Sequence, residues 1–156
     1  SGARGTARPA TTKAAPGDEP MTAHGAAPLI VTAPFGSFTP DQWAALTDLA
    51  DRLPVRELRM TPWRTVVVPG AGPADRPALA AAGLITDPAS PEARLGACIG
   101  TPGCASSRTD VRRDAEPRHS TLPTYWSGCE RRCGRPAGPH VAVVAQPDGT
   151  YRTTTE

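Results

Sequence analysis

The chain has 156 residues, which is enough for one ordinary domain or two small ones. It contains 15 Gly and 19 Pro but only 4% aromatic residues, so any core is built from few large side chains. The formal net charge is +2, and the basic residues are scattered along the sequence, which argues against a nucleic-acid surface. No apolar run approaches the roughly eighteen residues that span a bilayer, which argues against a membrane helix.

The first 27 residues are mostly Ala, Pro, Thr and Gly and show no hydrophobic period. Such a segment cannot bury enough apolar surface to fold, so residues 1–27 are predicted to form a disordered tail. No leader with a basic start, an apolar stretch and a cleavage site is visible, and we therefore expect a protein of the reducing cytoplasm.

A strand and then a helix are predicted directly after this tail. The apolar run 29–31 indicates a buried strand. Thr39 begins the helix as its cap, and Gln42 lies three residues later, as a capping box requires. The helix carries apolar residues on one face and ends at Pro54.

Residues 57–68 then predict one or two strands. Strand, helix and strand together make residues 28–70 half of a ferredoxin-like α+β unit. Residues 71–94 are predicted to be a linker that contains a short helix over 77–82, stopped by Gly83.

Residues 95–156 are expected to form a second unit. A helix is predicted over 105–116, with its first N–H groups facing the cysteines. Strands are expected at 122–126 and 141–145, and Asp148-Gly149 indicates a hairpin turn to a further strand.

The four cysteines of the chain form two tight pairs among glycines. Cys98 and Cys104 make a C-x5-C pair, and Cys129 and Cys133 make a C-x3-C pair. Four thiolates are the standard ligand set of a [4Fe-4S] cluster, and nearby glycines let backbone N–H groups approach the sulfurs. The pattern therefore predicts a cluster site.

Three other interpretations of the cysteines remain open. Two disulfides are possible in three connectivities, although nothing points to an oxidising compartment. A structural zinc ion would accept four thiolates, but the C-x5-C spacing falls outside the usual two to four residues. Unrelated buried thiols are the third alternative, and their clustering in two glycine-rich loops disfavours it.

The cysteine pattern resembles the cluster motif of the nitrite and sulfite reductase superfamily: C-x5-C followed by S-G-C-x3-C-G. Further stretches resemble one family within it, the precorrin-3B synthases. They lie at 58–64, 66–70 and 126–136, and the last contains Glu-Arg-Arg between the two cysteines.

The resemblance implies an α+β fold in which a ferredoxin-like half-domain is followed by a nitrite/sulfite reductase-type 4Fe-4S cluster domain over residues 95–156. It implies that Cys98, Cys104, Cys129 and Cys133 hold the [4Fe-4S] cluster, and that Cys133 bridges to a sirohaem where haem is present. The implied reaction is the O₂-dependent hydroxylation and lactone formation on precorrin-3A in aerobic cobalamin biosynthesis, with a separate non-haem iron as a further candidate cofactor.

The resemblance also implies partners. These are a tetrapyrrole substrate, an electron donor protein or reductase, and a chain that supplies the N-terminal half, because family members contain two related halves and this sequence matches the second. The alternatives are a sulfite or nitrite reductase fragment with sirohaem, or a non-catalytic 4Fe-4S electron-transfer module.

Three arginines are candidate substrate-binding residues, because Arg captures carboxylates in a bidentate manner and precorrins carry many carboxylates. They are Arg59, Arg64 and Arg135. Strand-edge solvation is the alternative for the first two. His140 is a candidate iron ligand, although a single His before a strand is more often structural. No catalytic residue can be assigned from the sequence.

Overall fold

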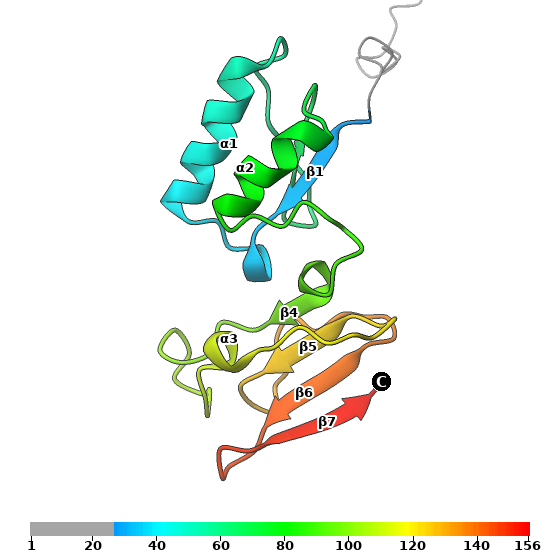
Figure 1. Cartoon of the computed structure of the whole chain (residues 1–156). Helices are drawn as coiled ribbons and strands as arrows, with labels where there is room; N and C mark the ends of the chain where they lie inside the picture. Colours follow the sequence, from blue (N-terminus) through cyan, green and yellow to red (C-terminus); the bar gives the residue numbers. More distant parts are fainter. Residues whose placement is uncertain (1–26) are drawn as a thin grey trace, which may run out of the picture.

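The structure, a computed structural model, describes residues 27–156 and shows two stacked units (Figure 1). The predicted tail, apart from Ala27, lies outside the described residues. The first unit contains β1 (Leu29–Thr32), α1 (Pro40–Arg52), β2 (Arg59–Met60), β3 (Thr65–Val68) and α2 (Arg76–Ala81). The second contains β4 (Leu95–Ala97), α3 (Val111–Asp114), β5 (Thr124–Ser127), β6 (Val141–Ala145) and β7 (Tyr151–Thr155).

The sheet of the first unit is antiparallel, with strand order β1-β3-β2. Leu29 pairs with Val68 and Val31 with Val66, and all four side chains are buried in one core with Leu46 of α1. The opposite face of the sheet is open, since Ile30 is 48% exposed there. The predicted strand 29–31 is confirmed, and the segment 57–68 forms two strands.

The helix α1 begins as the sequence predicts. The backbone N–H of Gln42 donates to Oγ1 of Thr39, and the backbone N–H of Thr39 donates to Oε1 of Gln42 at 3.0 Å. Both bonds of the capping box are therefore present. Of the helices in residues 27–156, none has the length and apolar character needed to cross a membrane.

The segment 71–94 contributes to the first core. Ala71, Leu79 and Leu84 are buried in it, and α2, whose last residue is Ala81, is stopped by Gly83, which has a φ of +77°. The N–H of Leu84 donates to the carbonyl of Leu79, as in a Schellman motif. Because the chain then pairs Ile85 with Thr32 of β1, the first unit extends beyond residue 70.

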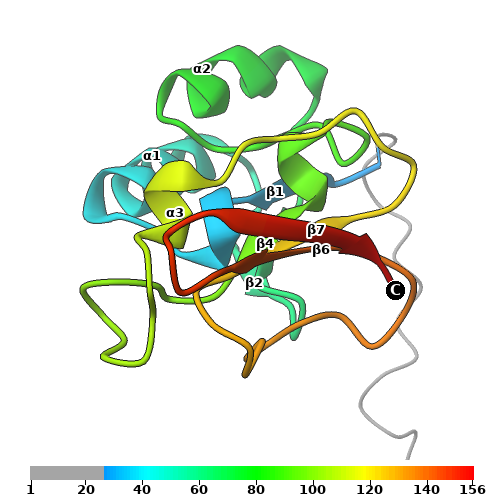
Figure 2. The same ribbon diagram turned by 90° about the horizontal axis from the view of Figure 1, so that it is seen from below.

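The sheet of the second unit has the order β4-β5-β6-β7. The first three strands are parallel, and β7 returns antiparallel to β6. Figure 1 places β4 next to the first unit and β7 farthest from it, and Figure 2 shows β7 in front in the view from below. Ala97, Trp126 and Val143 form the core of this sheet with Val111 of α3.

The predicted helix over 105–116 is wrong. Only Val111–Asp114 is helical, and Asp110 caps this short turn by accepting from the N–H of Arg113. The N–H of Arg108 donates instead to the carbonyl of Gly128, and the N–H of Ser107 closes a turn onto Cys104. Contacts with another loop thus replace the local bonds of a helix.

Candidate functional site

The four cysteines line one cavity of about 390 Å³. Cys98 follows β4 and Cys129 follows β5, so both come from the carboxyl ends of parallel strands, which meet at one edge of the sheet. Cys104 and Cys133 close the two loops, and all four residues are free thiols. The structure therefore brings the two pairs of the sequence to one place.

Gly128 joins the two cysteine loops. Its N–H donates to Sγ of Cys98 at 3.2 Å, and its carbonyl accepts from the N–H of Arg108 at 2.8 Å. A Cβ atom on Gly128 would lie 1.8 Å from Oγ of Ser107. Only glycine fits here, because the backbone of one loop passes directly against a side chain of the other.

Tyr125 is a cavity residue that the sequence analysis did not single out. Its ring lies against Gly96, where a Cβ atom would come within 2.7 Å of it, and its hydroxyl donates to the carbonyl of Cys133 at 2.7 Å. Burial, followed by the nearby charge of Cys98, raises the pKa of Tyr125. The only sequence signal was its place in the strand, two residues before Ser127 and the second cysteine pair.

Four arginines line the cavity, and no carboxylate does: Arg64, Arg112, Arg131 and Arg132. Two of the three arginines named from the sequence lie elsewhere. Arg59 pairs with Glu57 at 2.8 Å in an exposed contact, and Arg135 lies 3.6 Å from a carboxylate oxygen of Glu156. Among the predicted substrate-binding arginines, only Arg64 therefore lines the cavity.

Arg64 reaches the cavity from the first unit through an unusual backbone conformation. Its φ is +60°, which non-glycine residues seldom adopt. Its side chain lies over Gly36, where a Cβ atom would come within 2.7 Å of Cδ of Arg64. The missing side chain at Gly36 thus gives Arg64 its position.

Residues 28–83 match the family model described as nitrite/sulfite reductase ferredoxin-like half domain. The first unit is therefore similar to such a half domain. The match covers less than half of the chain and does not extend to β4–β7. No curated protein matches the chain. The half domain places the chain near an oxidoreductase superfamily and confirms the ferredoxin-like part of the predicted fold.

The cavity beside the half domain does not bring its thiols together around one point, as a single metal ion requires. Zinc requires sulfurs about 2.3 Å from one point. Within residues 27–156, no three His, Cys, Asp or Glu side chains converge closely enough to hold one ion. A [4Fe-4S] cluster takes each thiolate at a different iron, so its ligands stand further apart around a larger space. Four thiols line the cavity, and a Gly128 N–H is directed at one of the sulfurs, so the ligand set of such a cluster is present.

His140 lies away from this cavity. It precedes β6 at the amino ends of the parallel strands, opposite the edge from which the cysteines emerge. Its side chain is buried, and Nδ1 lies 2.9 Å from the carbonyl of Gly138. Nε2 has no hydrogen-bond partner among the described residues. The structure therefore does not bring His140 to the cysteines; His119 is exposed, and His24 lies outside the described residues.

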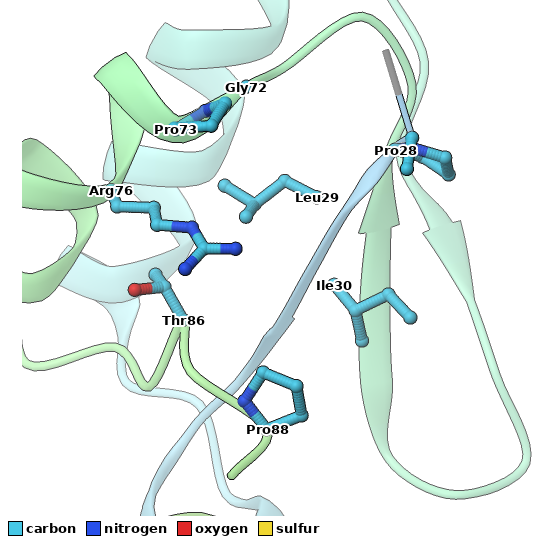
Figure 3. Close-up of a pocket in the computed structure, with 9 residues that line it drawn as sticks. Pro28, Leu29, Ile30, Gly72, Pro73, Arg76, Thr86 and Pro88 are labelled. Carbon is cyan, nitrogen blue, oxygen red and sulfur yellow. The ribbon is translucent and has the colours of Figure 1, made fainter. Parts of the chain in front are cut away.

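A second cavity, of about 290 Å³, lies on the half domain beside the start of β1 (Figure 3). Leu29, Ile30 and Pro88 form apolar walls, and the side chains of Arg76 and Thr86 reach toward it. No thiol, carboxylate or imidazole lines it. This cavity lacks the groups of a redox site, so the cysteine cavity is the candidate functional site.

Proposed function

We propose that this chain is the cluster-bearing half of an iron–sulfur oxidoreductase of the precorrin-3B synthase type. Cys98, Cys104, Cys129 and Cys133 would hold a [4Fe-4S] cluster. The observation that supports this most directly is the convergence of all four free thiols on one cavity. When bound, the cluster supplies one-electron transfer.

The residues around the thiols suit an anionic group. Gly128 donates an N–H to Cys98, and such hydrogen bonds to sulfur raise the reduction potential. Arg64 and Arg131 line the cavity and make no ion pair with a described residue, so their positive charges lower the cost of added negative charge. The same guanidinium groups are suited to the carboxylates of a tetrapyrrole substrate.

The proposed reaction is the O₂-dependent hydroxylation and lactone formation on precorrin-3A in aerobic cobalamin biosynthesis. Reducing equivalents come from an electron donor protein or reductase, and Cys133, the exposed member of the four, lies where such a donor could approach. A chain that carries the N-terminal half would complete the substrate site. We place the protein in the cytoplasm, where thiols stay reduced.

The exposure of Cys133 also supports a second candidate, a sulfite or nitrite reductase fragment in which Cys133 bridges to sirohaem. Anaerobic reconstitution with iron and sulfide tests the cluster, and expression with sirohaem separates the two. The synthase should bind about four iron and four sulfide per chain and show a broad absorption shoulder without haem bands. Strong haem bands after expression with sirohaem would favour the reductase, and zinc as the sole bound metal would reject both.

Turnover then tests the substrate. Reconstituted protein, supplied with the N-terminal half, a competent reductant and air, should convert precorrin-3A into precorrin-3B. Arg64→Gln should weaken precorrin-3A binding about tenfold or more, the value of one charge-assisted hydrogen bond. Arg59→Gln is the matched control, because Arg59 is outside the cavity and should leave binding unchanged. A loaded cluster without product would indicate an electron-transfer module instead.

A further inference from the structure

One side chain of the second unit contacts both the half domain and the first cysteine. Nε of Arg112 donates to the carbonyl oxygen of Cys98 at 3.1 Å, and Nη1 donates to Oγ of Ser37 at 3.2 Å. The guanidinium carbon also lies 5.6 Å from the centre of the Phe35 ring, in cation–π range. Arg112 thus connects a half-domain turn to the backbone of a residue that lines the cavity.

The turn 33–37 anchors the two units at once. Phe35 has a φ of +56° and packs against the core of the second unit, with Trp126 and Val111. Phe38, three residues later, packs against the first core and lies 5.1 Å from the ring of Trp43. Two aromatic side chains three residues apart therefore pack against different cores.

The turn 33–37 also positions the residue that the half domain contributes to the cavity. Gly36, between Phe35 and Ser37, provides the space over which the side chain of Arg64 lies. Arg64 lines the cavity from the half domain, and Cys98 lines it from the second unit. The turn 33–37 thus contacts both sides of the cavity. It contacts Arg64 directly, and it is connected to Cys98 through Arg112.

We infer that Arg112, together with Phe35 and Ser37, forms a clamp that sets the position of Cys98 against the half domain. Arg112 is a positioning residue: it acts on the ligand loop through the Cys98 carbonyl and not through the sulfur. The guanidinium fork is required, because two donors must reach two acceptors in different units. This inference deepens the proposed function, since it assigns the half domain a role in holding the cluster ligand.

The first test uses protein without metal, so it does not depend on the proposed function. Hydrogen exchange is followed in the peptide that covers β4 and Cys98. Ser37→Ala should speed exchange there about fivefold, the effect of one lost hydrogen bond, and Arg112→Gln, which loses two, should speed it more. Arg113→Gln is the matched control, because the Arg113 side chain is 74% exposed and pairs only with neighbouring Asp114 among the described residues. Unchanged exchange in Ser37→Ala would overturn the clamp.

The second test measures iron loss to a chelator from the reconstituted protein. Arg112→Gln should lose iron about 10- to 100-fold faster, the range found for groups that orient metal ligands. Arg112→Lys keeps the charge but lacks the fork and should behave like Arg112→Gln, whereas parental retention of iron in Arg112→Lys would show that only charge matters. Ser37→Ala combined with Arg112→Gln should lose iron no faster than Arg112→Gln alone, because both remove the same connection. If the two substitutions multiply each other's effect on the rate of iron loss, the clamp is rejected.

These outcomes separate the inference from the proposed function. If the parental protein takes up no cluster, the proposed function fails, and the exchange measurement still decides on the clamp. If the cluster loads normally and exchange at Cys98 does not respond to Ser37→Ala, the clamp alone fails.

Discussion

The N–H of Gly128 donates to Sγ of Cys98 across 3.2 Å, so the second cysteine loop contacts a sulfur of the first. The two residues are 30 positions apart in the sequence. Because this contact joins the loops at the sulfur itself, the geometry of the four thiols depends on how closely the two loops pack.

Replacing Gly128 by alanine should break this packing. The new Cβ atom would lie 1.8 Å from Oγ of Ser107. We expect Gly128→Ala to lose about 1–3 kcal/mol in the free energy of unfolding, the usual cost of overpacking, together with most of its iron-binding capacity. Gly138 lies later in the same β5–β6 connection with no atom within 4 Å of its Cβ position, so Gly138→Ala should behave like the parent in urea unfolding. Equal stability of the two variants would contradict the close approach at Gly128.

Removing one thiol should affect both metal content and stability. Cys98→Ser should lose most of the bound iron, because it deletes one of the four proposed ligands. Since metal binding contributes to folding free energy, we expect the melting temperature to fall by at least about 5 °C, which corresponds to about 2 kcal/mol in a chain of this size. Parental protein stripped with a chelator should melt close to Cys98→Ser. Full iron content in Cys98→Ser would show that Cys98 is not a ligand.

Stability should fall in alkaline solution through Tyr151. Burial raises the pKa of Tyr151 above its usual 10; its hydrogen bond with Thr109 opposes the shift, and the bond with Asp114 adds to it. The folded state therefore holds the phenol proton to higher pH than the unfolded state. This stabilisation is complete below pH 10 and is lost as the pH rises through the folded pKa. Urea unfolding from about pH 8 to 11 should give a flatter profile for Tyr151→Phe than for the parent. Identical profiles would exclude Tyr151 as a cause.

The cap of α1 can be tested in isolation from the cavity. Thr39→Ala removes the acceptor for the N–H of Gln42 and should cost about 1 kcal/mol in the free energy of unfolding. Thr39→Ser should retain most of this stability. Thr47→Ala is the control within the same helix, because the Thr47 hydroxyl bonds only to carbonyls of the preceding turn, and alanine is the better helix former. A loss at Thr47 as large as at Thr39 would contradict a specific cap.

The sequence predicted best those elements that local chemistry determines. The capping box of Thr39 and Gln42 lies within four residues, so α1 could be placed from sequence. The turn before Thr150 was likewise predictable, because Gly149 has a φ of +84°, which an Asp-Gly pair favours. These signals do not depend on distant parts of the chain.

Long-range contacts explain what the sequence could not show. The strand β4 could not be predicted, because a glycine such as Gly96 weakens a strand interior. In the structure, the missing side chain of Gly96 makes room for the ring of Tyr125. The helix predicted after Cys104 fails because the N–H of Arg108 bonds a carbonyl of another loop. The sequence does not indicate a positioning role for Arg112, because that role depends on a hydrogen bond to Ser37, which lies 75 positions away. The convergence of the cysteines was expected from the resemblance to the nitrite and sulfite reductase superfamily. In the structure it arises because Cys98 and Cys129 follow the parallel strands β4 and β5 at the same edge of the sheet.

The left-handed conformation of Phe35 bears on how this polypeptide can be divided. Its ring is partly buried against the hydrophobic core of the β4–β7 portion, although it belongs to the segment that precedes α1. A polypeptide that starts at residue 87 would therefore lack the ring that packs against this core. Any attempt to express the thiol-bearing portion alone has to replace this missing contact.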